Sequence, residues 1–153
     1  METEQCCITI FLGLIVCLTQ IAAVPYKDCG STGGKVNAVI VKGCETSDVC
    51  KLQRGTNVSI EVDFTSMEGS DKATSVVHGI IGGISVPFHL SNPDACTGCN
   101  LDCPLVNGKN YQFITSLTVL KEYPLIRLVV KWELQDANSH DIFCIELPAQ
   151  IVD

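Results

Sequence analysis

Alternation of apolar and polar residues is the dominant pattern along the chain. In residues 57–64 every second residue is apolar, and the residues between them are Asn, Ser, Glu and Asp. Residues 126–134 show the same alternation, interrupted only by Val129 on the polar side. A period of two places successive side chains on opposite faces of an extended chain, so both segments are predicted to be strands with one buried face.

Four further segments favour strands because they are rich in Val and Ile and are separated by turn-forming residues: 36–41, 75–86, 110–120 and 142–152. No stretch has the 3.6-residue period of a helix over three turns. Short strands with one polar face each predict an all-β fold, an immunoglobulin-like β-sandwich of two antiparallel sheets. No linker or repeat interrupts the pattern, so these strands are expected to form one domain.

The first 23 residues have a different character. An apolar run covers residues 8–18, and the small residues Ala22 and Ala23 precede Val24. This run is shorter than the roughly 20 residues that span a bilayer, and it is typical of a secretory signal peptide. We therefore expect a leader at residues 1–23 and a secreted domain at 24–153. The triplet Asn57-Val58-Ser59 fits this route, and Asn57 is the predicted glycosylation site.

The charge of the chain limits its partners. Lys and Arg together number 10 and Asp and Glu number 17, which gives a net charge of −7. Removal of the leader takes away Glu2 and Glu4 and leaves −5. No run or cluster of basic residues is present to neutralise a phosphate backbone, so nucleic acid is not an expected partner.

The chain has ten cysteines, and three of them fall in the predicted leader. The seven that remain are Cys29, Cys44, Cys50, Cys96, Cys99, Cys103 and Cys144. A secreted domain uses cysteines mainly for disulfides, and an odd number leaves one over. Spacing suggests a short loop closed at 44 and 50, a second at 96 and 103, and a long one from 29 to 144, but spacing alone does not fix the connectivity.

Catalytic and metal-binding chemistry finds little support. Cys96 and Cys99 have the Cys-x-x-Cys spacing of a redox or zinc site, with Cys103 nearby. No helical pattern follows to lower a thiol pKa, and prolines flank the segment, so a structural disulfide is the preferred interpretation. The three histidines, His78, His89 and His140, share no metal-ligand spacing, and no motif of a hydrolase or phosphate-binding loop is present. We expect no enzyme, no catalytic residue and no metal.

Apolar residues are abundant for two small sheets. Tyr111, Phe113, Leu117 and Val119 fall on one face of a predicted strand, and aromatic residues stand beside prolines at 86–88 and 123–124. These side chains could fill the core or line a cavity between the sheets. Periodicity does not distinguish the two.

Seven blocks of sequence, in order from Lys27 to Val152, resemble the ML lipid-recognition family. They are KDCGS at 27–31, VVHG at 76–79, VPF at 86–88, EYP at 122–124, LVVKW at 128–132, LQD at 134–136, and FC at 143–144 with PAQIV at 148–152. Ordered blocks over nearly the whole predicted domain are far more specific than one motif.

This resemblance implies a sandwich whose sheets separate to hold a lipid in an apolar pocket. It implies three disulfides, Cys29–Cys144, Cys44–Cys50 and Cys96–Cys103. Cys99, which interrupts the family's two-cysteine loop, is then a free thiol or an intermolecular partner. The residues that match the family's ligand-binding positions are Val86, Phe88, Val119, Tyr123, Pro124 and Trp132.

The function implied is that of a monomeric, secreted or lysosomal carrier of cholesterol or a similar sterol, without cofactor or covalent chemistry. Its cargo would pass to a membrane surface or a membrane-protein acceptor. Two alternatives stay open: a carrier of fatty acids or hydrophobic chemical signals, and a lipid-recognition protein that acts in innate defence through a receptor.

Overall fold

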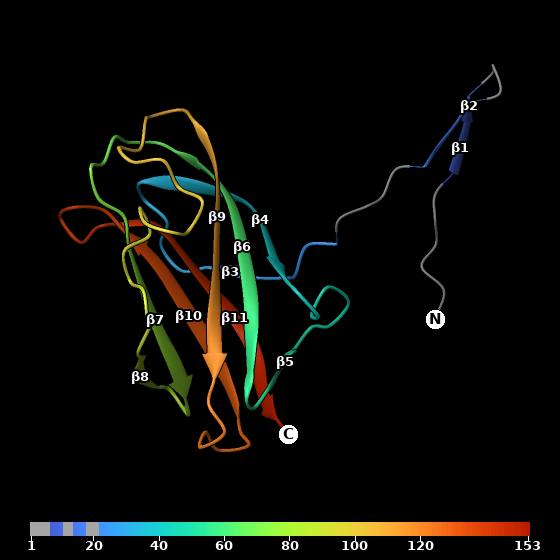
Figure 1. The fold of residues 1–153 in the computed structure, drawn as a ribbon, viewed down its shortest axis with the longest axis vertical. Helices are drawn as coiled ribbons and strands as arrows, with labels where there is room; N and C mark the ends of the chain where they lie inside the picture. Colours follow the sequence, from blue (N-terminus) through green and yellow to red (C-terminus); the bar gives the residue numbers. More distant parts are fainter. Residues whose placement is uncertain (1–6, 11–13, 18–21) are drawn as a thin grey trace.

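The computed structural model describes residues 7–10, 14–17 and 22–153, and the strands within 22–153 are arranged as two facing sheets (Figure 1). The larger sheet has the order β3 (Lys27–Asp28), β11 (Asp141–Val152), β10 (Arg127–Gln135), β7 (Thr74–Ile81) and β8 (Ile84–Phe88), with β5 (Cys50–Gln53) also paired to β11. The smaller sheet has the order β4 (Gly34–Val41), β6 (Thr56–Ser66) and β9 (Asn110–Val119). The predicted all-β sandwich is confirmed.

A short hairpin lies within the predicted leader. Its strands, β1 (Cys7–Ile10) and β2 (Leu14–Cys17), pair with each other in antiparallel register. The other residues from 1 to 21 lie outside the described part of the chain, so the leader at 1–23 stays a prediction. Within the described residues no helix has the length and apolar character needed to cross a membrane.

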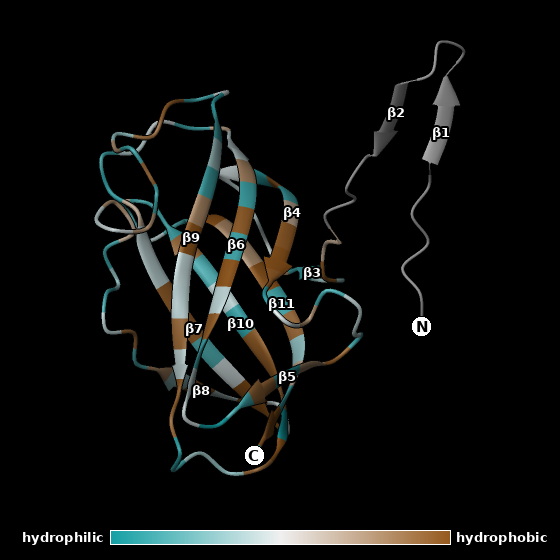
Figure 2. Cartoon of the chain, turned by 45° about the vertical axis from the view of Figure 1, so that its right-hand side comes forward, coloured by the Kyte–Doolittle hydropathy of each residue, from teal (hydrophilic) through white to brown (hydrophobic). Residues whose placement is uncertain are grey.

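Register places the predicted apolar faces between the sheets. Along β6 and β9, Val62 lies opposite Phe113 and Phe64 opposite Tyr111, and all four side chains are buried. In Figure 2 teal and brown bands alternate along β6, β9 and β10, which is the hydropathy pattern of strands with one face toward a core. The alternation in residues 57–64 and 126–134 therefore predicted the buried faces correctly.

Aromatic rings fill the sandwich at the end where β6 stops and β9 begins. The Phe143 ring makes edge-to-face contacts with Phe64 at 5.4 Å and with Phe113 at 5.9 Å between centroids. Trp132 packs edge-to-face on Phe113 at 6.3 Å. Such pairs add about 0.5–1.5 kcal/mol each to the stability of the fold beyond the burial of their apolar area. The aromatic cluster therefore holds the two sheets together at this end.

The segment predicted as one strand at 75–86 is two strands. The chain reverses at Gly82 and Gly83, whose φ angles of 56° and 83° lie in the left-handed region that favours glycine. The resulting hairpin pairs β7 with β8 and places Val77 opposite Phe88. Within residues 24–153 two strands were not predicted, β3 with two residues and β5 with four, and β5 runs parallel to β11 rather than antiparallel.

Among the described residues there are three disulfides, with the pairings that the family resemblance implied. Cys29–Cys144 joins the start of the domain to β11, Cys44–Cys50 closes the loop between β4 and β5, and Cys96–Cys103 closes a loop between β8 and β9. Among the described residues, Cys99 is a free thiol with 2% of its surface exposed.

Candidate functional site

A small apolar cavity lies between the sheets, at the end of the sandwich where residues 120–126 connect β9 to β10. This end, opposite the aromatic cluster, is called the cavity end below. Its volume is about 30 Å³. Both sheets line it, with Leu52, Val77, His78, Gly79, Phe88, Leu117, Val119, Tyr123, Leu128, Val130 and Ile151. Most of these are aliphatic or aromatic, because the inward positions of β5, β7, β9, β10 and β11 converge there.

Two aromatic rings close the cavity on one side. Phe88 at the end of β8 and Tyr123 in the loop after β9 make an edge-to-face contact, with centroids 5.5 Å apart and planes at 67°. Both rings are half-buried. Burial and the nearby Glu122 carboxylate raise the pKa of the Tyr123 hydroxyl, so it stays protonated at neutral pH.

The same two rings also line an open groove on the outside of the molecule. This outer groove has a volume of about 350 Å³ and is lined by Phe88, His89, Leu90, Ser91, Ser116, Thr118, Leu120 and Tyr123. Because Phe88 and Tyr123 border both spaces, the pair separates the inner cavity from the outside.

The loop that carries Tyr123 is held at several points. The Arg54 guanidinium donates a hydrogen bond to the Tyr123 carbonyl oxygen at 3.3 Å and forms an ion pair with Asp153. The Tyr123 N–H donates to the carbonyl oxygen of Leu120 at 3.2 Å. The backbone beneath the ring is thus fixed while the side chain remains half-exposed.

The structure brings together three of the six residues expected from the resemblance. Phe88, Val119 and Tyr123 surround the cavity. Trp132 is 1% exposed and belongs to the aromatic cluster, where its indole N–H donates to Ser75 Oγ at 2.7 Å. Val86 on β8 is 44% exposed, and Pro124 is also exposed in the loop; neither lines the cavity.

Several cavity residues were not predicted as such. Leu128 and Val130 were assigned to an apolar strand face, but alternation does not show which part of a face borders a void. Leu52 arrives through the parallel pairing of β5 with β11, opposite Ile151. A four-residue strand has too short a pattern to reveal this.

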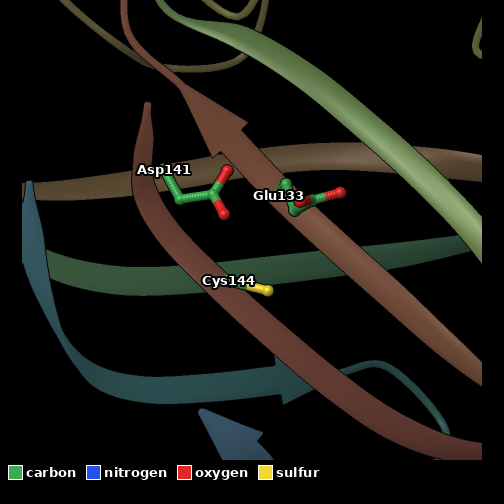
Figure 3. Close-up of side chains that lie close together, drawn as sticks. All are labelled: Glu133, Asp141 and Cys144. Carbon is green, nitrogen blue, oxygen red and sulfur yellow. The ribbon is translucent and has the colours of Figure 1, made fainter. Parts of the chain in front are cut away.

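A second cluster of chemical interest lies on the outer face of the larger sheet (Figure 3). Ligand atoms of Glu133, Asp141 and Cys144 lie within 4.8 Å of one another. Cys144 is bonded to Cys29, so its sulfur is not a thiolate that could bind a metal ion. The cluster does not provide the donor set of a metal centre.

Glu133 was expected on a solvated face but is only 7% exposed. Lys131 Nζ lies 3.0 Å from Glu133 Oε1, and His78 Nδ1 lies 3.6 Å from Glu133 Oε2. Burial and the Glu133 charge raise the pKa of the neighbouring Asp141 carboxyl. Lys131 therefore compensates the charge of Glu133 directly, and the His78 ring lies beside the same carboxylate.

Comparisons with known proteins agree with this architecture. The family model described as the ML domain matches residues 23–151. The chain is 45% identical over 130 residues to "NPC intracellular cholesterol transporter 2 homolog a" of Drosophila melanogaster, covering 84% of this chain and 88% of that protein. It is 41% identical over 143 residues to "NPC intracellular cholesterol transporter 2" of Mus musculus, covering 94% and 95%.

A solved structure, that of a Niemann-Pick type C2 protein from the Japanese carpenter ant, superimposes with a TM-score of 0.79 at 25% identity, over 84% of this chain and 99% of that one. Chicken MD-1, solved in complex with lipid IVa, has a TM-score of 0.52 at 16% identity over 80% and 85%, a likeness of fold alone. By sequence and by fold, the chain belongs to the ML-domain family, whose members are lipid-binding proteins and not enzymes.

Proposed function

We propose that this protein binds cholesterol or a similar sterol between its two sheets and carries it as a secreted or lysosomal protein, with residues 1–23 removed as a leader and 24–153 forming the carrier. The observation that carries the proposal is the apolar cavity behind the Phe88–Tyr123 pair. The fly and mouse relatives, which are named cholesterol transporters, support the choice of cargo.

The cavity must expand to accept such a molecule. Its volume of about 30 Å³ is a tenth or less of the roughly 300–1,000 Å³ of ordinary ligand pockets. A bound sterol that hides on the order of 400 Å² of apolar surface gains roughly 10 kcal/mol before association and ordering costs. Separating the Phe88–Tyr123 rings costs only about 0.5–1.5 kcal/mol of pair energy. Burial of the sterol can therefore drive the opening.

Exposed apolar side chains at the cavity end support transfer of the cargo to a membrane or a membrane-protein acceptor. Ile84, at the start of β8, is 70% exposed, and Val86, Leu120 and Leu125 are exposed near it in the hairpin and the 120–126 loop. An apolar surface beside the mouth of the cavity would let a sterol leave without crossing open water.

Loading of delipidated protein tests the proposal. The protein is incubated with vesicles that contain cholesterol, separated from them, and examined by native mass spectrometry, with oleic acid as a competing ligand. We expect one sterol per chain and preference for cholesterol over oleic acid. Preference for oleic acid would change the cargo to fatty acids, and failure to take up any hydrophobic ligand at micromolar concentration would refute a carrier function.

A further inference from the structure

The outer groove continues into a second, more polar space. This polar hollow has a volume of about 360 Å³ and shares Leu90, Ser91 and Ser116 with the outer groove. We propose that the outer groove and the polar hollow together hold the uncharged, hydroxylated headgroup of an amphipathic lipid, such as a sugar, while the apolar body of the same lipid occupies the cavity. This inference rests on the proposed function and extends it to the class of cargo.

Shared lining residues place the three spaces next to one another. Phe88 and Tyr123 border both the cavity and the outer groove. Ser91 and Ser116 border both the outer groove and the polar hollow. A lipid whose body lies behind the Phe88–Tyr123 pair and whose head passes that pair would enter the outer groove, where Ser91 and Ser116 border the polar hollow.

The chemistry of the walls changes along this path. The cavity is lined mainly by aliphatic and aromatic side chains. The polar hollow presents the hydroxyls of Ser59, Ser91, Thr115 and Ser116 and the amide of Asn92. The four hydroxyls make no side-chain hydrogen bond within the part of the chain that the structure describes, and each can both donate and accept. This set matches the hydroxyls of a sugar, which also donate and accept.

Charge argues against an anionic head. The described residues that line the outer groove and the polar hollow include no Lys, Arg, Asp or Glu, and His89 is their one basic side chain. Phosphate and sulfate are held in proteins by Arg, Lys or clustered backbone N–H groups, and the net charge of −5 on residues 24–153 would repel them at long range.

The edge position of β9 supplies further polar groups. β9 is the last strand of the smaller sheet, so its outer edge has no neighbouring strand in the described structure. The N–H of Ile114 on this edge already donates to the carbonyl oxygen of Cys99 at 3.0 Å, which joins the loop carrying Cys99 to the strand and forms one wall of the polar hollow. Further along β9, Ser116 and Thr118 border the outer groove.

Three probes share one sterol body and differ only in the headgroup: cholesterol, cholesteryl glucoside and cholesterol sulfate. Differences in their affinities therefore report the contribution of the headgroup to binding. Each is titrated against wild-type protein preloaded with a fluorescent sterol. We expect the glucoside to displace that sterol at least as well as cholesterol, and the sulfate to be the weakest. A sulfate that binds as tightly as the glucoside would overturn the assignment of an uncharged head.

Variants locate the headgroup. Ser91→Ala combined with Ser116→Ala removes two shared hydroxyls and should weaken glucoside binding about tenfold while cholesterol changes less than about twofold. Ser47→Ala with Ser85→Ala is the matched control, because both serines lie outside the two spaces; Ser85 is exposed and Ser47 is half-buried. If cholesterol binds but the double variant leaves the glucoside unaffected, the headgroup site is wrong and the carrier function stands. If no sterol binds, the proposed function fails and the headgroup site fails with it.

Discussion

Replacing Phe88 by Ala removes half of the aromatic pair that closes the cavity. The ring is half-buried, so about 100 Å² of its surface is available to contact a bound sterol. At about 25 cal/mol per Å² this contact is worth about 2.5 kcal/mol. A loss of that size weakens binding about 70-fold.

The same substitution should leave the fold intact. Phe88 lies at the end of β8 and its ring pairs with Tyr123 rather than with the aromatic cluster, so its removal costs one edge-to-face pair and part of one burial, about 2 kcal/mol. Domains of this size have about 5–15 kcal/mol of stability to lose. Phe88→Ala should therefore unfold cooperatively, at a lower temperature than the wild type.

Titration with a fluorescent sterol measures the affinity, and circular dichroism melts verify folding. Met67→Ala is the matched control, because Met67 is an exposed apolar residue that follows β6 at the opposite end of the sandwich. It should bind sterol as the wild type does. A folded Phe88→Ala variant that binds within threefold of the wild type would refute the role given to this ring.

Three further predictions concern the rest of the molecule. The pKa of the Asp141 carboxyl is raised in the folded protein, so its ionised form destabilises the fold at pH values above that pKa. This loss of stability disappears as the pH falls through the raised pKa. Asp141→Asn should therefore raise the melting temperature at neutral pH and not at about pH 3. Replacing both Cys29 and Cys144, which are 115 residues apart, by Ser should cost about 4–5 kcal/mol in a denaturant titration, against about 2 kcal/mol for the short loop at 44–50. Asn57 is exposed on β6, so protein from a secreting eukaryotic host should lose mass on treatment with an N-glycanase, and Asn57→Gln should show no such loss.

Much of the fold could be predicted because the decisive signal is local. Val62 and Phe64 alternate with Glu61 and Asp63, and burial follows this alternation whatever the partner strand is. The hairpin between β7 and β8 was missed because Val and Ile recur on both sides of the reversal in residues 75–86, although the Gly82-Gly83 pair marks it. Here a two-residue signal determined the structure within a longer segment that is rich in β-branched residues.

The site was less predictable because a cavity is a property of packing between sheets. Phe88, Val119 and Tyr123 were expected from family resemblance, and the structure brings them together. Trp132 shares an inward face with Val130, yet it packs into the aromatic cluster while Val130 borders the cavity. Trp132 and Val130 have the same place in the alternating pattern. They differ only in position along β10, and this position decides which side chain is in the packed core and which borders the cavity.

The aromatic cluster and the cavity lie at opposite ends of the same sandwich, and this has a consequence for its internal motions. The proposed exchange of cargo would need the cavity end to open repeatedly, while Phe64, Phe113 and Phe143 hold the other end closed. Amide hydrogens in β6 and β9 beside that cluster should exchange with solvent only when the whole domain unfolds, whereas those of β8 and residues 120–126 should exchange through small, frequent openings. One end of the sandwich can then open often without bringing the domain close to global unfolding.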